Sequence, residues 1–415
     1  MRRQRRQLLL GSLAAITGLG VAAAWRYWPD QGLVNPCHAA LPQRLAQHEL
    51  VRSAWEGVAP EQVWDCHAHL AGTGDSASGI RINPGMHSLL QPLQYAQRLF
   101  YLNAGCAHNT PGRIDESYVE RMHNLLDGMP RGCKLMLLAF DRYHAADGAA
   151  SWENTAFYVP DAYAMRIAQR HPAYFEWVAS IHPYRNDAVA ALHAAKNAGA
   201  RAVKWLPAAM GIDPASPHCD AFYAAMHALD LPLITHAGME RALDVADRQH
   251  FSNPLLLRRA LEHGVRVIVA HCATMGQDRD LDRGKNGPFV DSFGLFARLM
   301  DDERYGKTLY GDLSAVTQIN RAGPALARIM RQQSWHSRLL NGSDYPLPGI
   351  MPLYSLNQLA QMRFIQPGMA PVLTEIRQHN PLLFDFVLKR HLRSDGQTLP
   401  AGIFETRRFF TRETT

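Results

Sequence analysis

Short apolar runs alternate along the chain with longer stretches in which apolar positions recur every three or four residues. An apolar run of about four to eight residues is typical of a buried strand, and the longer spacing is typical of a helix packed on a sheet. The runs predict strands at residues 62–66, 134–140, 175–181, 202–206, 231–235, 265–270, 308–313 and 338–341. Helices are predicted between most of them, at residues 161–170, 187–198, 221–229, 254–263, 293–302 and 321–333.

This alternation predicts an α/β fold, specifically a (β/α)8 TIM barrel formed by residues 61–392. An open, doubly wound sheet is the rival arrangement. No glycine-rich phosphate loop opens any predicted helix, which weakens the nucleotide-binding form of that rival.

Two long interruptions separate predicted strands. The longer one, Ala71–Gly132, follows the first strand and contains two predicted helices, near residues 86–102 and 115–126. The second, Met275–Asp291, follows the sixth strand and is rich in charge and glycine. Loops at the carboxyl ends of barrel strands carry the chemistry, so we expect both segments to form the substrate pocket or a lid.

Residues 1–28 are typical of a targeting segment. Four arginines among the first six residues precede an uncharged run from Leu8 to Ala24, and Arg5-Arg6 resembles a twin-arginine export signal. Cleavage would leave the protein in the periplasm, whereas a retained segment at residues 8–28 would anchor it to the periplasmic face of the inner membrane. A buried N-terminal helix is the remaining alternative. We expect residues 29–60 to lead into the barrel and residues 393–415 to form a C-terminal tail.

The charge of the chain is concentrated at its ends. The formal net charge is +6, but residues 1–30 carry +4 and residues 389–415 carry +3, which leaves the body at −1. A nearly neutral body argues against a nucleic-acid surface. The six cysteines are scattered without a Cys-x-x-Cys pair, so the sequence predicts no zinc knuckle and identifies no disulfide.

The segment Asp65-Cys66-His67-Ala68-His69 carries the clearest chemical signal. Strand alternation predicts that Asp65, His67 and His69 share one face, with Cys66 and Ala68 on the other. Two imidazoles on one face can bind one divalent ion, and Asp65 can orient them. An isolated His-x-His often arises by chance, so its meaning depends on the rest of the chain.

Other strand ends carry residues of the same kind. The fifth predicted strand ends at His236, the sixth at His271 and the eighth at Asp344, and the fourth contains Lys204. Each one alone is compatible with an ordinary buried residue, but all of them together predict one site at the carboxyl rim of the barrel. Polar residues after the second and third strands, Arg142 and His182, are weaker candidates for substrate contact.

In this ordered set the chain resembles the amidohydrolase superfamily, in its amidohydrolase-2 branch. The resemblance covers about residues 60–390 and rests on the segments VWDCHAHL, RAVKWLP, LPLITHAG, RVIVAHCATMG, NGSDYP and NPLLFDF. It implies that His67, His69 and His236 bind the metal and that Asp344 is a further ligand or the catalytic base. By the same resemblance, His271 is a catalytic acid/base or a ligand to a second ion. Lys204 is either a carboxylated bridge between two ions or a lysine packed at the strand end.

Three imidazoles and a carboxylate leave an open coordination position, which is typical of a catalytic zinc site. We therefore predict one or two divalent ions, with Zn²⁺ first, and a hydrolase that uses a metal-activated water on an amide, lactone or ester of a small molecule. The alternative within the branch is a non-oxidative decarboxylase. Several of its decarboxylases carry Glu where this chain has Asp65, which favours hydrolysis. A non-catalytic, membrane-tethered binding barrel is the third hypothesis. The sequence does not indicate an oligomeric state.

Overall fold

The structure is a computed structural model in which residues 29–107, 110–243, 245 and 247–411 are described. Eight parallel strands form the centre of this described part. They are β1 (Trp64–His69), β3 (Lys134–Leu138), β7 (Phe175–Val178), β8 (Val203–Trp205), β9 (Leu233–Thr235), β10 (Val267–Val269), β13 (Leu309–Asp312) and β14 (Leu339–Leu340). Each overlaps one of the eight predicted runs, so the strand prediction is confirmed.

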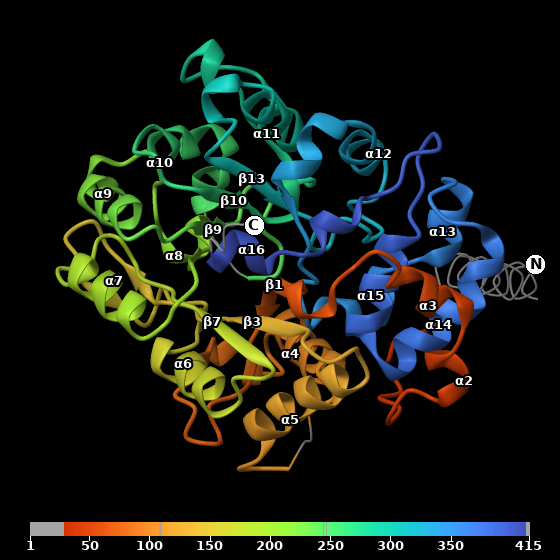
Figure 1. Cartoon of the computed structure of the whole chain (residues 1–415). Coiled ribbons are helices and arrows are strands. Elements are labelled where there is room, and N and C mark those ends of the chain that lie inside the picture. The colour runs from red at the N-terminus through yellow and green to blue at the C-terminus, as the bar shows by residue number, and fades with distance from the viewer. Residues whose placement is uncertain (1–28, 108–109, 244, 246, 412–415) are drawn as a thin grey trace, which may run out of the picture.

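The strands close into a ring in chain order. One arc joins β1, β3 and β7, and the other joins β8, β9, β10, β13 and β14. Parallel bridges between Ala179 and Val203 and between Ala68 and Tyr345 connect the two arcs. Figure 1 shows the ring surrounded by helices. The predicted TIM barrel is therefore confirmed, whereas the predicted signal or anchor at residues 1–28 lies outside the described residues.

Helices cover the outside of the ring (Figure 1). Those that follow barrel strands are α6 (Asp161–Arg170), α7 (Ala188–Asn197), α9 (Asp220–Ala228), α10 (Arg258–Glu262), α11 (Ser292–Met300), α12 (Pro324–Arg331) and α15 (Pro381–Arg390). A further group beside α15 comprises α2 (Gln43–Ala46), α3 (Glu49–Ala54), α13 (Leu356–Gln361) and α14 (Ala370–His379). Local sequence explains their starts. In α15, for example, the Asn380 side chain accepts a hydrogen bond from the Leu383 amide and Pro381 occupies the first turn.

The core has an inner and an outer layer. Alternate strand residues such as Met136, Ile234 and Ile268 fill the barrel interior, while their neighbours pack outward against the helices. The short helix α16 (Arg407–Thr411) lies over the centre of the ring in Figure 1, and its Phe410 belongs to the interior cluster. The amino-terminal end of the barrel is thus closed by the chain's own C-terminal segment.

The insertion after β1 contains both predicted helices, α4 (Pro92–Ala104) and α5 (Ile114–Asp127). A two-residue strand, β2 (Arg81–Ile82), pairs with β6 (Phe157–Tyr158). A disulfide joins Cys37 of the lead-in to Cys106, just beyond α4. The second interruption forms a small hairpin of β11 (Gln277–Arg279) and β12 (Phe289–Asp291). Within the described ranges, no helix combines the length and apolar character needed to cross a bilayer.

A bulge in β1 corrects one prediction. The register of β1 against β3 shifts between Asp65 and Ala68, which inserts one extra residue into β1. Asp65 consequently does not share a face with His67 and His69. Its carboxylate instead accepts hydrogen bonds from the backbone amides of His67 and Ser343, at 3.1 and 2.8 Å. Asp65 thus anchors the strand end. The alternation pattern alone had placed its side chain on the wrong face of the strand.

Candidate metal centre

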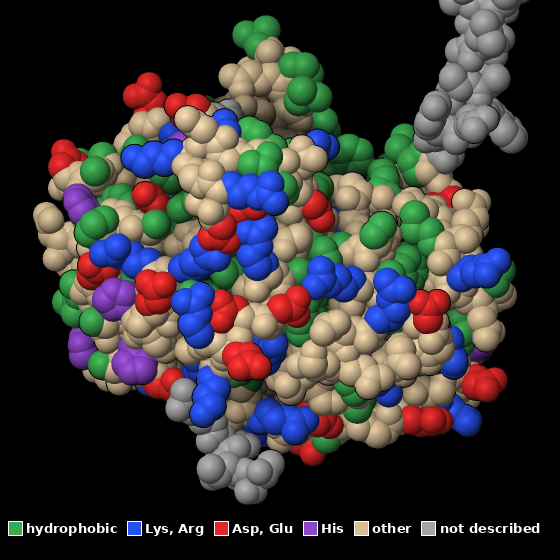
Figure 2. Space-filling model, turned by 90° about the horizontal axis from the view of Figure 1, so that it is seen from above, with side chains coloured by type: hydrophobic (Ala, Val, Ile, Leu, Met, Phe, Trp, Pro, Cys, Tyr) green, Lys and Arg blue, Asp and Glu red, His purple; other side chains and the backbone are tan. Residues whose placement is uncertain are grey.

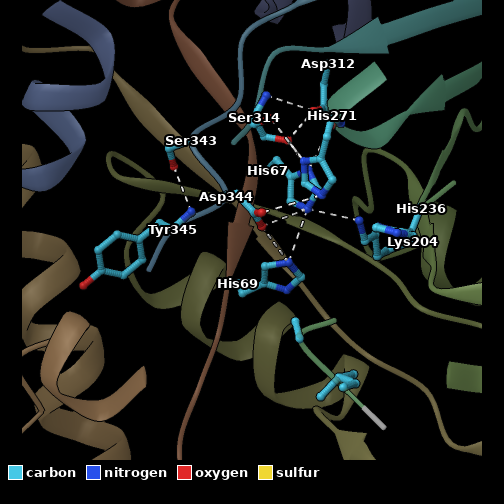
Figure 3. Close-up of polar contacts among 12 residues, drawn as sticks. His67, His69, Lys204, His236, His271, Asp312, Ser314, Ser343, Asp344 and Tyr345 are labelled. Carbon is cyan, nitrogen blue, oxygen red and sulfur yellow. Dashed lines mark hydrogen bonds and ion pairs between the residues drawn. The ribbon is translucent and has the colours of Figure 1, made fainter. Parts of the chain in front are cut away.

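Seven polar side chains of the described residues converge at the carboxyl rim of the barrel (Figure 3). They come from six strands: His67 and His69 from β1, Lys204 from β8, His236 from the end of β9, His271 from the end of β10, Asp312 from β13 and Asp344 from the loop after β14. All the predicted site residues are among them.

One cluster consists of His67, His69 and Asp344. The Nε2 atoms of the two histidines lie 3.2 Å apart. An oxygen of Asp344 lies 3.4 Å from His67 Nε2 and 3.2 Å from His69 Nε2. These three side chains each offer one ligand atom within 4.8 Å of the others, a spacing at which a single ion can contact all three.

Asp312 orients His67 and was missed in the sequence. Its Oδ2 lies 2.8 Å from His67 Nδ1, so the Nδ1–H donates to the carboxylate and Nε2 is left as the ligand atom. Its other oxygen accepts hydrogen bonds from the amides of His271 and Ser314, at 2.9 and 3.0 Å. In the sequence Asp312 stands inside the apolar run predicted at residues 308–313, so no strand-end signal marked it.

Both carboxylates of the site are held ionised. Burial by itself raises the pKa of Asp312, but His67, His271 and the Ser314 hydroxyl together bring it below its usual value. For Asp344, burial is again opposed, here by His271, His67 and His69, and the pKa falls well below its usual value. Negative charge therefore persists at the rim despite its burial.

His271 faces Asp344 from the opposite side of the cluster. Its Nε2 lies 3.6 Å from Asp344 Oδ2, and its Nδ1 lies 3.1 Å from the carbonyl oxygen of Ser314. Because a carbonyl can only accept, Nδ1 carries the proton and Nε2 presents a lone pair to the site. Burial and the nearby Arg321 lower the pKa of His271 well below its ordinary value, which keeps this imidazole neutral.

The unpaired ring nitrogen of His236 tests whether a metal fits this site. Its Nδ1 lies 3.6 Å from Glu240 Oε2, while its Nε2 is buried without a hydrogen-bond partner in the part of the chain that the structure describes. A buried polar atom left unpaired is costly. An ion at the rim would satisfy this nitrogen, so the donor set fits a divalent metal.

Lys204 is fully buried beside the same ligand atoms. Its Nζ lies 3.1 Å from His67 Nε2. Burial lowers the pKa of Lys204, while Asp312 and Asp344 oppose that shift. Lys204 therefore lies at the ligand cluster, a position that fits both predicted roles, the carboxylated bridge and the lysine packed at the strand end.

The loop that carries Asp344 is fixed from beneath. The amide of Asp344 donates to the His67 carbonyl at 2.8 Å. Lys389 of α15 is fully buried and donates to the Gly342 carbonyl and to Asp385, at 2.7 and 2.6 Å. Together with the hydrogen bonds that Asp65 accepts, these contacts hold β1 and the Asp344 loop in one position.

Two cavities open onto the rim. One of about 120 Å³ is lined mainly by apolar side chains, including Leu70, Ile82, Met86, Phe140 and Phe157. The other, of about 280 Å³, is lined by more polar residues, including Gln318, Asn320 and Arg321. His236, Glu240, His271 and Asp344 line both. The insertion after β1 contributes to both walls, as predicted, whereas from the second interruption only Met275 lines one of these two cavities.

Two weaker candidates lie elsewhere. His182 is completely buried, with Nε2 donating to the Met210 carbonyl at 2.9 Å, and lines neither cavity. The Arg142 guanidinium stacks over the rings of Trp152 and Tyr158 instead of facing the site. Arg321, which the sequence pattern did not single out, brings a buried guanidinium to the polar cavity.

The chain matches one protein-family model and several solved structures. The amidohydrolase family model matches residues 64–363, well over half of the chain. No curated protein matches the chain. Solved structures similar to it include an uncharacterized TIM-barrel protein from Bordetella bronchiseptica, with 15% identity over 75% of this chain and 98% of that one, and a TM-score of 0.45.

Two others have comparable scores. A candidate 2-pyrone-4,6-dicarboxylic acid hydrolase from Pseudomonas putida is 18% identical, covering 78% of this chain and 97% of its own, with a TM-score of 0.40. The IDCase of Metarhizium anisopliae is 14% identical, covering 87% and 99%, with a TM-score of 0.46. On the family match and the His/Asp groups able to hold an ion, the chain belongs to the amidohydrolase family of metal-dependent enzymes.

Proposed function

We propose that the protein is a metal-dependent hydrolase of a C–N or C–O bond, such as an amide, lactone or ester, in a small molecule. The observation that carries this proposal is the convergence of His67, His69 and Asp344 with the unpaired Nε2 of His236. Nitrogen and carboxylate donors in this ratio favour Zn²⁺. A bound ion would acidify water and polarise a substrate carbonyl.

Asp344 and His271 handle the proton. Asp344 is ionised and lies beside both histidines of β1, so it can accept a proton from the attacking water. His271 is neutral with its Nε2 lone pair 3.6 Å from Asp344, so it can take the proton and deliver it to the leaving group. Only after it is protonated can His271 donate to a developing oxyanion. Asp312 keeps His67 in the tautomer that metal binding requires.

Non-oxidative decarboxylation is the second candidate, and one observation favours it. The buried guanidinium of Arg321 lines the polar cavity, with an Nε that has no partner among the described residues. Such a group could hold a substrate carboxylate. The ligand set and the membership of an enzyme family argue against a non-catalytic binding barrel.

Export and periplasmic residence, free or anchored through residues 8–28, belong to the same proposal. The disulfide between Cys37 and Cys106 supports it, because disulfides persist in oxidising compartments. Fractionation of the source cells should find the protein outside the cytoplasm. Recovery of the reduced protein from the cytosol alone would contradict this part.

The reaction is tested by a screen of esters, lactones, amides and aromatic carboxylic acids with detection of both acid release and carbon dioxide. We expect acid release without carbon dioxide, lost on chelation and restored by Zn²⁺. Asp344→Asn should reduce the rate by at least 100-fold, since a general base contributes about 10²–10⁴-fold. Carbon dioxide as the product would replace hydrolysis by the second candidate.

A further inference from the structure

Helix α4 is poorly covered by the rest of the molecule. Of its 13 residues, only Ala104 is buried. Four leucines in and just before it are exposed: Leu89 by 76%, Leu90 by 93%, Leu93 by 82% and Leu99 by 48%. Single exposed leucines are ordinary, but a group this dense marks an interaction surface. In Figure 2, hydrophobic side chains gather on the projection at the top of the view.

The sequence around these leucines carries almost no charge. From Ile82 to Gln97 the sequence contains no Asp, Glu, Lys or Arg, and the next charged residue is Arg98. An apolar stretch bordered by a cation is suited to the surface of a bilayer with anionic headgroups.

The same insertion forms the wall of the apolar cavity. Ile82, Met86, Tyr101 and Leu102 line that cavity beside His67 and His69. The exposed leucines and the cavity wall thus lie on one short segment. Apolar material bound at α4 would therefore lie on the same segment that lines the apolar cavity.

Contacts between α4 and the lead-in, residues 29–60, bear on whether lipid or a second copy of the chain covers α4. The disulfide at Cys106 fixes Cys37 beside the end of the helix. The Asn35 amide donates to Asn103 Oδ1 at 2.8 Å, and Asn103 Nδ2 donates to the Asn35 carbonyl at 3.1 Å. Leu33 and Val34, 40% and 66% exposed, add two further apolar side chains at this point.

The lead-in also limits the distance to the apolar N-terminal run. That run ends at Ala24, nine residues before Leu33. Nine residues span at most about 30 Å. If residues 8–24 enter a bilayer, Leu33 lies within that distance of its surface, and the end of α4 at Asn103 lies beside the lead-in. This favours lipid over a second copy of the chain as the occupant.

We propose that residues 82–107, together with Leu33 and Val34, form a membrane-contacting surface through which an amphiphilic substrate enters from the bilayer. This proposal rests on the proposed hydrolase function. The apolar cavity takes the apolar part of the substrate, and the cavity at Arg321 takes its polar group. A hydrogen bond of 3.1 Å from the Tyr101 hydroxyl to the Ala242 carbonyl joins two residues that line both cavities. The bond to be cleaved would lie at the junction, where His236, His271 and Asp344 lie.

The contact itself is tested on the full-length protein, without reference to activity. The free cysteines of the described residues, Cys66, Cys133, Cys219 and Cys272, are buried, so an introduced surface cysteine can be labelled selectively. Leu90→Cys and the matched control Val189→Cys, which lies on α7 and is 37% exposed in the wild type, would each carry an environment-sensitive dye. The probe is vesicles of mixed phosphatidylglycerol and phosphatidylcholine.

We expect vesicles to shift the emission of the dye at position 90 to the blue and to leave the dye at position 189 unchanged. No shift at position 90 while the protein co-sediments with vesicles would overturn the proposal. A shift that depends on protein concentration in the absence of lipid would also overturn it, because a second copy would then cover α4.

Substrate entry is tested with two esters. The triple variant Leu89→Gln, Leu90→Gln, Leu93→Gln should lower kcat/KM at least 10-fold for p-nitrophenyl decanoate in the vesicles and leave soluble p-nitrophenyl acetate unaffected. Equal loss on both esters, or on neither, would contradict entry through α4. Absence of all ester hydrolysis would instead count against the proposed reaction, while the dye shift would still decide the membrane contact.

Discussion

His67 is the side chain on which most interactions of the site converge. Its Nδ1 faces Asp312, and its Nε2 lies near His69, Lys204 and Asp344. A ring held on one side by a carboxylate presents its other nitrogen at a fixed position. The position of the His67 ligand atom therefore depends on Asp312, which holds the ring at its other nitrogen.

Replacing Asp312 tests this dependence. Asp312→Asn keeps the shape but removes the charge that fixes the His67 tautomer, so metal affinity should fall about 10–100-fold. Competition with a fluorescent zinc chelator measures it. Asp395→Asn is the control, since Asp395 is an exposed carboxylate bonded to Arg331. Equal affinities of the two variants would refute the role of Asp312.

His182 gives a pH prediction away from the site. Burial lowers its pKa to about 3, whereas the unfolded chain titrates near the ordinary 6.5. The unfolded state therefore binds the proton first, and stability is lost as pH falls from about 6.5 toward 3, by up to about 1.4 kcal/mol per pH unit.

Urea unfolding of wild type and His182→Gln across this range measures the effect. The difference between their free energies of unfolding should be constant above pH 7 and shrink as the pH falls. A difference that is independent of pH would show that His182 is not the titrating group.

The sequence predicted that His236, His271 and Asp344 lie at one rim, because each lies at or near the end of an apolar run, and the structure brings them together. Asp312 was missed because the predicted run, residues 308–313, continues past it, which made the carboxylate look internal. Asp65 was placed on the wrong face, because a bulge depends on pairing with β3 and leaves no trace in the alternation of a single strand.

At the scale of elements, β1 and the loop after β14 lie so close together at Gly342 that no side-chain atom fits between them. A Cβ on Gly342 would lie 2.6 Å from His67 Cβ and 3.2 Å from Cys66 Sγ. Glycine is thus required at this position by contact rather than by its backbone angles.

Gly342→Ala should push β1 away from the Asp344 loop. We expect metal content to fall and the free energy of unfolding to drop by about 1–3 kcal/mol, as overpacked cores do. Gly368→Ala is the matched control, because a Cβ there meets nothing within 4 Å. Unchanged metal content in Gly342→Ala would mean that the two segments can separate without disturbing His67.

The elements themselves were largely predictable. All eight strands and both insertion helices were expected from periodicity, which reports burial on a sheet directly. Loop paths such as the closure of the barrel floor by α16 were not, because they depend on contacts between segments far apart in the sequence.

At the scale of the whole molecule, the disulfide closes a loop of 69 residues and fastens the lead-in to the insertion that lines the pocket. No pattern in the sequence paired Cys37 with Cys106, since the pairing follows from tertiary proximity. It connects the N-terminal end of the described chain to the active-site rim.

Removing this link should destabilise the molecule. The double variant Cys37→Ser, Cys106→Ser is expected to lose about 2–4 kcal/mol of unfolding free energy. Thermal melting with and without reductant provides the control, because reductant should lower the Tm of the wild type and leave that of the variant unchanged. A wild-type Tm insensitive to reductant would indicate that the bond contributes nothing.

We propose that the rim holds a catalytic metal through His67, His69, His236 and Asp344. The most direct test is metal analysis by mass spectrometry of the purified full-length protein beside its His236→Ala variant. We predict about one equivalent of a divalent ion, or two where Lys204 is carboxylated, and a clear loss of metal in the variant. A wild-type protein that binds no divalent ion, or a variant that retains its full content, would contradict the account.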